Sequence, residues 1–406
     1  MPHFLDSVPF SGIIRIRDMM YSVERPFRLD QGDVSFDAPD SVKAAMAKAI
    51  ADNRSHYLQT AGVPRLQELL AEKLRRKNAV PVGSPDEVLV TNGGIHALYI
   101  LFQALLDPGD EVIIPDPQWP PAEGTILSAR GVVVRCPLHE AMGWRLDVDE
   151  LAERITPRTR VIYLNSPHNP TGGVLTRHDL ERIAALAQAH GLWIVSDEAY
   201  EDVVFDVEHV SIASIAGMYP MTVPVYTFSK SYAMTGLRLG YMAVADTALR
   251  DRVRKVLFFT TSNVSSVVQY GGIGALEGSQ DVVERYRTEL QARRDLFYAG
   301  VNTPGGILAG QPPNGAFYAF LRFDPDWKRR MALPPAGRFP ANPAVSPDGQ
   351  KSPSWELTEH LISAGRIGCI PGVDFGPTGE GYLRFCFARD RAELEGALNS
   401  LRELFP

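Results

Sequence analysis

Lys230 is the residue in this sequence whose surroundings most suggest covalent chemistry. It follows the apolar, β-favouring run at 225–228, and Arg238 lies eight positions beyond it. A lysine at the end of a buried strand costs free energy unless its amine stays in water, meets an anion or is used covalently. Because lysine amines form Schiff bases with carbonyl compounds, Lys230 is a candidate for such a bond. Taken alone, it could equally be a solvated loop cation.

Asp197 supplies a second chemical group. It leaves the apolar run at 192–195, and a carboxylate in such a place is costly unless it is paired. A protonated pyridine nitrogen would pair with it, and a ring kept cationic in this way accepts the electrons of a carbanion. Tyr200, three residues later, could hydrogen-bond a phenolic oxygen on the same ring. The aldehyde, pyridine and phenolic groups that these side chains would serve are those of pyridoxal phosphate (PLP).

A phosphate group would find donors in two further stretches. Gly93, Gly94 and Ile95 stand between a predicted strand and a predicted helix. Glycines there let the backbone approach a ligand, and a helix N-terminus offers free N–H groups. Ser229 and Arg238 would complete the site, the arginine by a charge-assisted contact. A plain tight turn is the alternative for the two glycines.

Three more side chains could contact a ring or a substrate. Asn169 lies in a rigid turn with two prolines and two glycines and could donate to a ring oxygen, or it could be a capping asparagine. Trp119, beyond the predicted strand at 111–114, could stack on a flat ring, or it could be a hydrophobic plug on the next helix. Arg384 interrupts an apolar strand and is well shaped to bind a carboxylate bidentately, or it could form a buried ion pair with a nearby acid.

The elements that must position these residues alternate between strands and helices. Apolar runs predict strands at 87–91, 111–114, 131–134, 160–164 and 192–195. These runs are continuously apolar, as expected for a sheet covered on both faces. Their alternation with helical stretches predicts an α/β layer with a largely parallel sheet. In such a sheet ligands lie beyond the carboxyl ends of the strands, where the candidate residues fall.

The two ends of the chain differ from this central part. Residues 1–40 lack regular patterning, and the last hundred residues predict a smaller unit with strands at 316–323, 366–370 and 382–387. We expect a large domain over 46–290 and a small α+β domain made of 1–45 and 291–406. The proline-rich stretch at 324–354 is long for a loop in a compact domain, so we expect it to be functional or mobile.

Composition excludes several classes of function. A net charge of −7 without a basic tract argues against nucleic acid as the main partner. The three cysteines, at wide spacing, fit a reducing compartment with neither a disulfide framework nor a metal site. No apolar run approaches the ~18–20 residues of a membrane span, and no secretory signal pattern is present. We therefore expect a cytoplasmic protein with no membrane partner.

The chain resembles the class I/II aminotransferases, the aspartate aminotransferase-like group of PLP enzymes of fold type I. Three motifs carry the resemblance: Ser-Lys-x-Tyr-x-Met-x-Gly-x-Arg-x-Gly-Tyr at 229–241, Asn-x-Pro-x-Asn-Pro-Thr-Gly at 165–172 and Asp-Glu-x-Tyr at 197–200. It extends from about Gly32 to Arg384. It implies the large domain of that fold type with a mostly parallel central sheet, and transfer of an amino group between an L-amino acid and a 2-oxo acid through aldimine and pyridoxamine phosphate intermediates.

The resemblance also assigns roles to individual residues. Lys230 would carry the cofactor and act as general base, while Asp197 would pair with the pyridine nitrogen. Tyr57 would reach the phosphate of the neighbouring subunit, which implies a homodimer with shared active sites. The remaining cofactor contacts would come from Gly93, Gly94, Ile95, Trp119, Asn169, Tyr200, Ser229 and Arg238. The substrate contacts would come from Gly32, Trp119, Asn169 and Arg384.

Two other functions are compatible with these cofactor motifs, and the sequence argues against the second. C–S β-lyases, decarboxylases and synthases of the same fold type share the cofactor machinery. A PLP-sensing regulator would need an N-terminal helix-turn-helix domain, for which the residues before Gly32 leave no room. No second arginine that would select a dicarboxylate is evident, and Ile95 and His96 stand where the family commonly has small or acidic residues.

Overall fold

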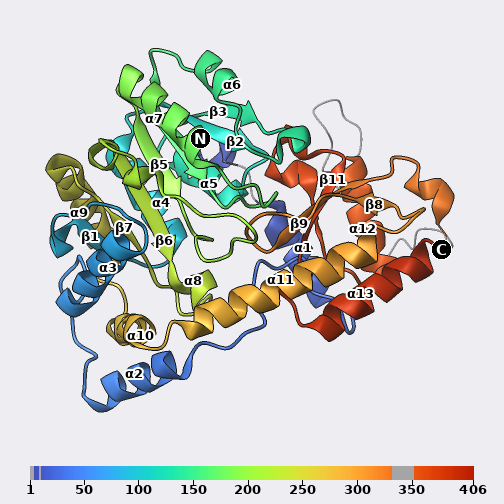
Figure 1. The fold of residues 1–406 in the computed structure, drawn as a ribbon, viewed down its shortest axis with the longest axis horizontal. Helices are drawn as coiled ribbons and strands as arrows, with labels where there is room; N and C mark the ends of the chain where they lie inside the picture. The colour runs from blue at the N-terminus through green and yellow to red at the C-terminus, as the bar shows by residue number, and fades with distance from the viewer. Residues whose placement is uncertain (1–3, 9–10, 332–351) are drawn as a thin grey trace.

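A seven-stranded sheet forms the centre of the molecule in the computed structural model, which describes residues 4–8, 11–331 and 352–406 (Figure 1). The strand order is β1-β7-β6-β5-β4-β2-β3. All neighbours pair in parallel except β7, which is antiparallel to both β1 and β6. The strands are β1 Val88–Thr91, β2 Glu111–Asp116, β3 Val132–Pro137, β4 Thr159–Asn165, β5 Trp193–Asp197, β6 Thr222–Thr227 and β7 Gly240–Ala243. The predicted mostly parallel sheet is confirmed.

Helices cover both faces of this sheet, which explains why its strands are apolar throughout. Val112 and Ile114 of β2 pack with one core, against α4 Gly94–Leu105, α5 Pro120–Ser128 and α9 Thr247–Thr261. Ile113, between them, packs on the opposite face against α6 Val148–Glu153 and α7 Arg177–His190. The two faces alternate because successive side chains of a strand point in opposite directions. A third core lies beside β1 and β7, under α2 Asp40–Ala51, α3 Pro64–Arg76 and α10 Ser266–Glu277.

A smaller antiparallel sheet lies at the other end of the molecule. Its order is β10-β11-β9-β8, with β8 Leu308–Ala309, β9 Tyr318–Phe323, β10 Ile370–Pro371 and β11 Tyr382–Cys386. The helices around it are α1 Gly12–Tyr21, α11 Asp281–Val301, α12 Pro353–Gly365 and α13 Arg391–Leu404. Figure 1 shows the long α11 leading from the region of α8 Phe228–Ser231 to this sheet. The fold is therefore α/β with a second, smaller α+β unit, as predicted.

Some local predictions were wrong. Residues 12–21 form the helix α1, although no helix was expected before residue 41. The strand expected at 366–370 is reduced to Ile370–Pro371, preceded by an isolated bridge between Phe27 and Ile367. The predicted loop at 324–354 contains a 3-10 turn at Trp327–Arg330, and α12 begins at its end; residues 332–351 lie outside the described residues.

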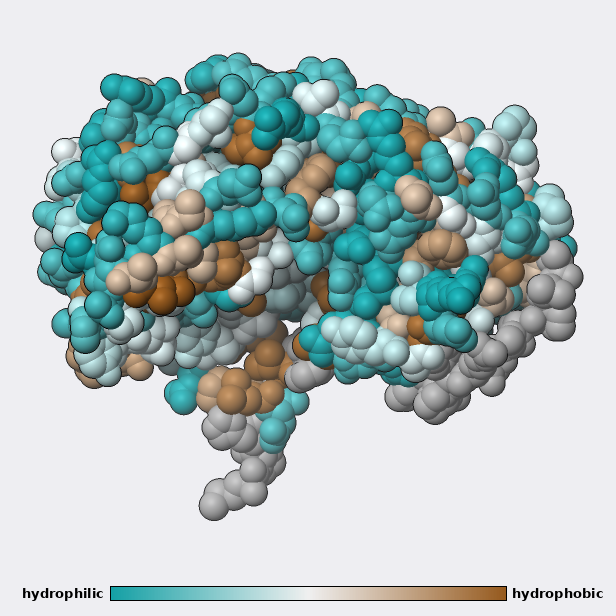
Figure 2. All heavy atoms as spheres, turned by 90° about the horizontal axis from the view of Figure 1, so that it is seen from below, coloured by the Kyte–Doolittle hydropathy of each residue, from teal (hydrophilic) through white to brown (hydrophobic). Residues whose placement is uncertain are grey.

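The predicted domain boundaries, after residues 45 and 290, fall inside α2 and α11 and stay a prediction. Among the residues that the structure describes, no helix has the length and apolar character needed to cross a membrane. The face seen in Figure 2 is mostly hydrophilic, with hydrophobic residues in small separate groups.

Candidate active site

A cavity of about 370 Å³ opens at the carboxyl ends of β4, β5 and β6, against residues of the small sheet. Eleven of the predicted residues line it: Gly32, Gly94, Ile95, Trp119, Asn169, Asp197, Tyr200, Ser229, Lys230, Arg238 and Arg384. Ile13 also lines it and belongs to the stretch 13–17, which is a candidate from the sequence for the wall that contacts the substrate side chain. Four lining residues were not predicted: Asn165, Ala199, Thr227 and Tyr318. Parallel strands end at the same edge of a sheet, so segments far apart in sequence meet here.

A second, larger hollow of about 680 Å³ contains none of the predicted residues and is lined by side chains such as Lys77, Arg177 and Arg287. Tyr57 lies in neither cavity. It is on the segment between α2 and α3, and 90% of its surface is exposed.

Lys230 lies in α8, the short helix that starts where β6 ends. The Thr227 hydroxyl caps this helix by accepting a hydrogen bond from the Ser229 N–H group. The Lys230 amine donates to the Gly32 carbonyl at 2.7 Å. Burial lowers its pKa to about 8. A neutral amine is the nucleophilic and basic form, so this environment favours both functions.

Asp197 is the last residue of β5, and its carboxylate is buried at the wall of the cavity. Burial raises its pKa to about 6, and a hydrogen bond from Tyr163 opposes that shift. One carboxylate oxygen accepts from the Tyr163 hydroxyl at 2.9 Å, and the other accepts from the Ala199 N–H group at 3.2 Å. At pH 7 the group is mainly an anion, and it has lone pairs left for a cationic ligand in the cavity.

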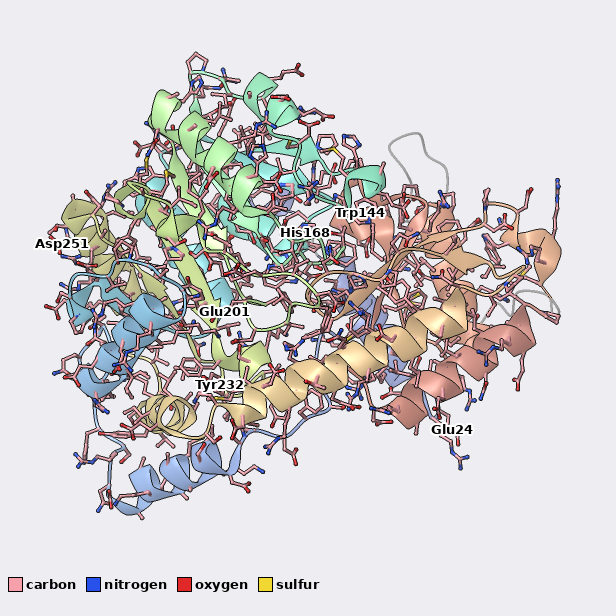
Figure 3. All side chains as sticks on the ribbon, in the orientation of Figure 1. Glu24, Trp144, His168, Glu201, Tyr232 and Asp251 are labelled. Carbon is pink, nitrogen blue, oxygen red and sulfur yellow. The ribbon has the colours of Figure 1, made fainter. Side chains whose placement is uncertain are left out.

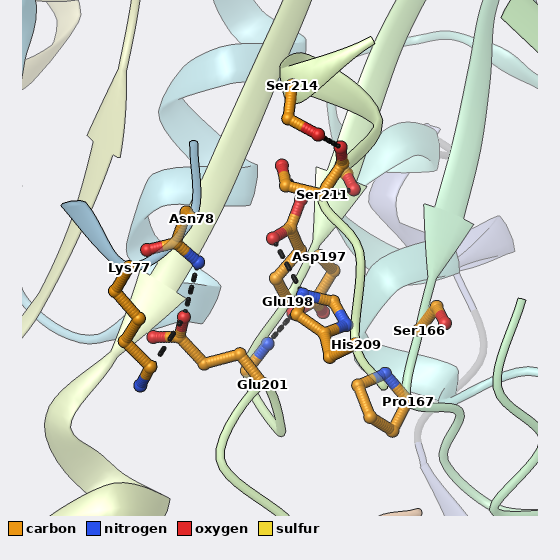
Figure 4. A network of polar contacts seen from close by, with 12 residues as sticks. Lys77, Asn78, Ser166, Pro167, Asp197, Glu198, Glu201, His209, Ser211 and Ser214 are labelled. Carbon is orange, nitrogen blue, oxygen red and sulfur yellow. Dashed lines mark hydrogen bonds and ion pairs between the residues drawn. The ribbon is translucent and has the colours of Figure 1, made fainter. Parts of the chain in front are cut away.

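The other acids of this segment serve the fold. Glu198 accepts hydrogen bonds from Ser196, Ser211 and His209. Glu201 binds Lys73 and Asn78. Figure 4 shows Glu198 facing His209 and Ser211, and Glu201 facing Asn78. Asp197 is thus the acid of this segment that lines the cavity.

The phosphate donors predicted from the sequence lie together. Gly93, at φ 81°, precedes the N-terminus of α4, and a Cβ atom there would lie 2.4 Å from the Arg238 Nη2 atom. Arg238 donates to the Thr235 carbonyl at 2.8 Å, and the ion pairs found among the described residues do not include it. A helix N-terminus, an arginine without a carboxylate partner and the Ser229 hydroxyl fit a phosphate ester. This fit supports the cofactor that the sequence implies.

Arg384 lies in the buried part of β11 and is 2% exposed. It donates to the Asn169 side-chain oxygen at 3.3 Å and to the Asp30 carbonyl at 2.7 Å, while its Nε–H group has no partner in the described part of the chain. No carboxylate pairs with it among the described residues, so the alternative of a buried ion pair does not apply. A buried guanidinium with an unused donor at a cavity fits an incoming carboxylate.

Two tyrosines complete the wall. The Tyr200 hydroxyl is 2.7 Å from the Tyr318 hydroxyl, and a Cβ atom on Gly32 would lie 2.2 Å from that Tyr318 oxygen. The Asn169 side-chain N–H₂ group makes no hydrogen bond within the described residues, so it is free to donate into the cavity. Trp119 lines the cavity, precedes α5 as its N-cap residue and packs against the core beneath that helix, so the stacking role stays a prediction.

Tyr163 and Tyr318 were missed because each lies in an apolar strand pattern. A hydroxyl in the middle of a buried strand is the signal that could have found Tyr163, since such a group needs a partner. Among the described residues, no cluster of three or more His, Cys, Asp or Glu side chains could hold a metal ion.

Comparison with known proteins agrees with this geometry. The family model for aminotransferase class I and II matches residues 24–401. The chain is 33% identical to aromatic-amino-acid aminotransferase 2 of Thermococcus litoralis over 98% of this chain and 97% of that one. It is 35% identical to the aspartate/prephenate aminotransferase of Thermus thermophilus over 91% and 88%.

A solved structure leads to the same family. The aspartate aminotransferase of Thermus thermophilus with maleate superposes with a TM-score of 0.86, at 32% identity, over 100% of this chain and 99% of that one. The cavity at the strand ends, its buried lysine and aspartate, and these relatives agree. The chain belongs to the class I and II aminotransferases.

Proposed function

We propose that Lys230, Asp197 and Arg384 carry the amino-group transfer of this enzyme. Aminotransferases of this family use pyridoxal phosphate, and they act on amino acids and oxo acids. The bound cofactor supplies an aldehyde for the amino group and a cationic ring that accepts electrons from the Cα atom. The observation that supports the assignment best is that one cavity holds the Lys230 amine and the Asp197 carboxylate.

Each residue has a distinct task in this proposal. The Lys230 amine would hold the cofactor through its aldehyde, and in its free, neutral form it would take up the Cα proton as general base. Asp197 would keep the ring nitrogen protonated, and Asn169 and Tyr200 would contact the phenolic oxygen. The guanidinium of Arg384 binds the substrate carboxylate. Trp119 would stack on the ring, and Gly32 would line the substrate side. The phosphate would be held by Gly93, Gly94, Ile95, Ser229 and Arg238.

Borohydride reduction tests the lysine. Reducing the reconstituted enzyme should fix the cofactor on the peptide that contains Lys230, as seen by mass spectrometry. The Lys230→Ala variant should carry no label there, and Lys73, whose side chain is only 14% exposed, serves as the internal control. Label on another lysine alone would contradict the assignment. In the same preparation, amino acids added one at a time should convert the cofactor to its amine form, as the absorbance shows; a lyase or decarboxylase would leave it in the aldehyde form.

Arg384→Lys tests the carboxylate contact. The variant keeps the charge but loses the two-pronged geometry, so the KM for amino acids is expected to rise about 10- to 100-fold. Arg322→Lys is the matched control, because Arg322 lies exposed on the neighbouring strand β9. Equal KM values for the two variants would contradict the role of Arg384.

We also propose a homodimer in which Tyr57 of each chain completes the cofactor site of the other. Tyr57 lies outside the cavity of its own chain and is almost fully exposed, and Phe259 is 83% exposed. Exposed aromatic side chains favour a surface that a second copy covers. A cytoplasmic location stays a prediction; the three cysteines are unpaired and buried, which agrees with a reducing compartment.

Complementation tests the shared site. Tyr57→Ala and Lys230→Ala are each expected to be inactive or weak. Mixed and allowed to exchange subunits, they should regain about a quarter of wild-type activity, because half the dimers are hybrids with one intact site each. No recovery, while sedimentation shows that hybrids have formed, would place Tyr57 outside the partner's site.

A further inference from the structure

A chain of hydrogen bonds ends on the Asp197 carboxylate. The Tyr163 hydroxyl donates to Asp197 at 2.9 Å, and the Gln118 side-chain amide nitrogen lies 3.5 Å from the Tyr163 oxygen. The Gln118 side-chain oxygen lies 3.2 Å from the His168 Nε2 atom, and His168 Nδ1 lies 2.7 Å from the Thr171 hydroxyl. Every member is buried. Figure 3 places His168 in the interior of the molecule, where α7 and the strands meet the small unit.

The protonation states of these side chains fix which group donates and which accepts in each hydrogen bond of the series. Burial lowers the pKa of His168 to about 3, so its ring is neutral and only one nitrogen carries a proton. Burial and the Asp197 charge raise the pKa of Tyr163, so its hydroxyl keeps its proton and donates it to the carboxylate. The Tyr163 oxygen must then accept from the Gln118 N–H₂ group, which turns the Gln118 oxygen toward the His168 Nε2–H group.

The far end of the chain is consistent with this direction. The Thr171 hydroxyl oxygen accepts from the Gly173 N–H group at 3.3 Å, which leaves its own proton for His168 Nδ1. Each group therefore accepts from the one behind it and donates toward Asp197. Aligned hydrogen bonds polarise one another in a low-dielectric interior, so the last donor in the series is strengthened.

The same chain connects the segments that hold the cofactor. Gln118 immediately precedes Trp119, and His168 immediately precedes Asn169. We propose that Tyr163, Gln118 and His168 are positioning residues that hold Asp197 ionised and aimed at the ring nitrogen of the cofactor, and that fix Trp119 and Asn169 relative to it. This inference rests on the proposed role of Asp197.

Tyr163→Phe tests the inference, because it removes one hydroxyl and keeps the ring. A hydrogen bond to a charged group is strong enough that its loss should raise the pKa of Asp197 by about one to two units. The other titratable groups that face Asp197 are Glu198, Tyr200 and Lys230, and the substitution leaves all of them in place. The dissociation constant of PLP is measured from pH 5 to 9 and is expected to rise as the pH falls and Asp197 becomes protonated. In Tyr163→Phe this rise should begin at a pH one to two units higher than in wild type.

Tyr226→Phe is the matched control. Tyr226 is equally buried, lies on the adjacent strand β6 and takes no part in this chain. Its pH profile should match that of wild type. Gln118→Leu breaks the chain one link further back and should shift the profile in the same direction by less, which also covers the case in which Tyr163→Phe fails to fold.

Asp197→Asn separates the two proposals. If this variant binds PLP as wild type does at every pH, the role of Asp197 is wrong. If it loses binding while Tyr163→Phe and Gln118→Leu both follow the profile of Tyr226→Phe, Asp197 keeps its role and the positioning chain is refuted. If the pH profile of PLP binding shifts no more in Tyr163→Phe than in Tyr226→Phe, the positioning role of Tyr163 is refuted.

Discussion

Replacing Gly93 by alanine tests the phosphate site with one methyl group. Gly93 has φ 81° and ψ 168°, a region that is nearly restricted to glycine, so alanine should cost about 1–3 kcal/mol of unfolding free energy. The added Cβ atom would lie 2.4 Å from the Arg238 Nη2 atom, closer than non-bonded atoms approach, so the guanidinium must move. A lost contact between this cation and the phosphate is worth about 1.5–3 kcal/mol, which predicts about 10- to 100-fold weaker PLP binding.

Gly109→Ala is the control that separates the effect of backbone strain from the effect of displacing the Arg238 guanidinium. Gly109 also has a positive φ, 94°, but an added Cβ atom there meets no atom within 4 Å. This control should lose stability and keep its affinity. Titrating the cofactor-free proteins with PLP measures the affinity, and urea unfolding measures the stability. The reasoning is refuted if Gly93→Ala binds PLP within twofold of wild type, or if Gly109→Ala weakens binding as much.

Two further predictions concern buried charges and their pH dependence. In the cofactor-free protein, Lys230→Met should raise the unfolding free energy by about 3 kcal/mol below pH 8, because burial lowers the pKa of Lys230 from 10.5 to about 8. Urea unfolding should show that this gain disappears between pH 8 and 10.5. A gain that persists at pH 10.5 would contradict the prediction. Asp374 accepts a hydrogen bond from Trp355 beside Gly12, and burial raises its pKa from 3.8 to about 7. As the pH rises from about 4 to 7, this carboxyl loses its proton in the unfolded chain but keeps it in the folded protein, so the free energy of unfolding falls. The advantage of Asp374→Asn over wild type in unfolding free energy should therefore grow by up to about 4 kcal/mol over that interval. A difference that does not change with pH would count against burial as the cause.

The sequence predicted the large sheet well because its strands are buried on both faces. Val112, Ile113 and Ile114 are all apolar since neighbouring positions face different helix layers. The site could be predicted for a related reason: its residues directly follow such strands, and parallel strands bring their ends together. Lys230 and Asp197 needed no knowledge of distant contacts to be placed at the same edge.

The missed elements lack these local signals. β7 is four residues long, begins with Gly240 and runs antiparallel, so neither length nor alternation reveals it. The α1 helix has only two buried residues, Ile16 and Met20, and its N-cap Ser11 makes no side-chain capping bond. Tyr318 enters the site through a hydroxyl contact with Tyr200, 118 positions away in sequence. No pattern within a strand can predict a partner at that distance.

Burial acts on the two central charges in opposite directions, and this has a consequence for the working pH. It raises the pKa of Asp197 to about 6 and lowers that of Lys230 to about 8. A carboxylate and a neutral amine therefore coexist from about pH 8 upward in the cofactor-free site, rather than only above the ordinary lysine value of 10.5. Exposing both groups to water would move both pKa values back toward their ordinary ranges, and a smaller fraction of the Lys230 amine would then be neutral at a given pH. The Tyr200 and Phe317 rings beside the Lys230 amine are therefore part of the chemistry, since the burial that lowers the pKa of Lys230 also raises its neutral fraction.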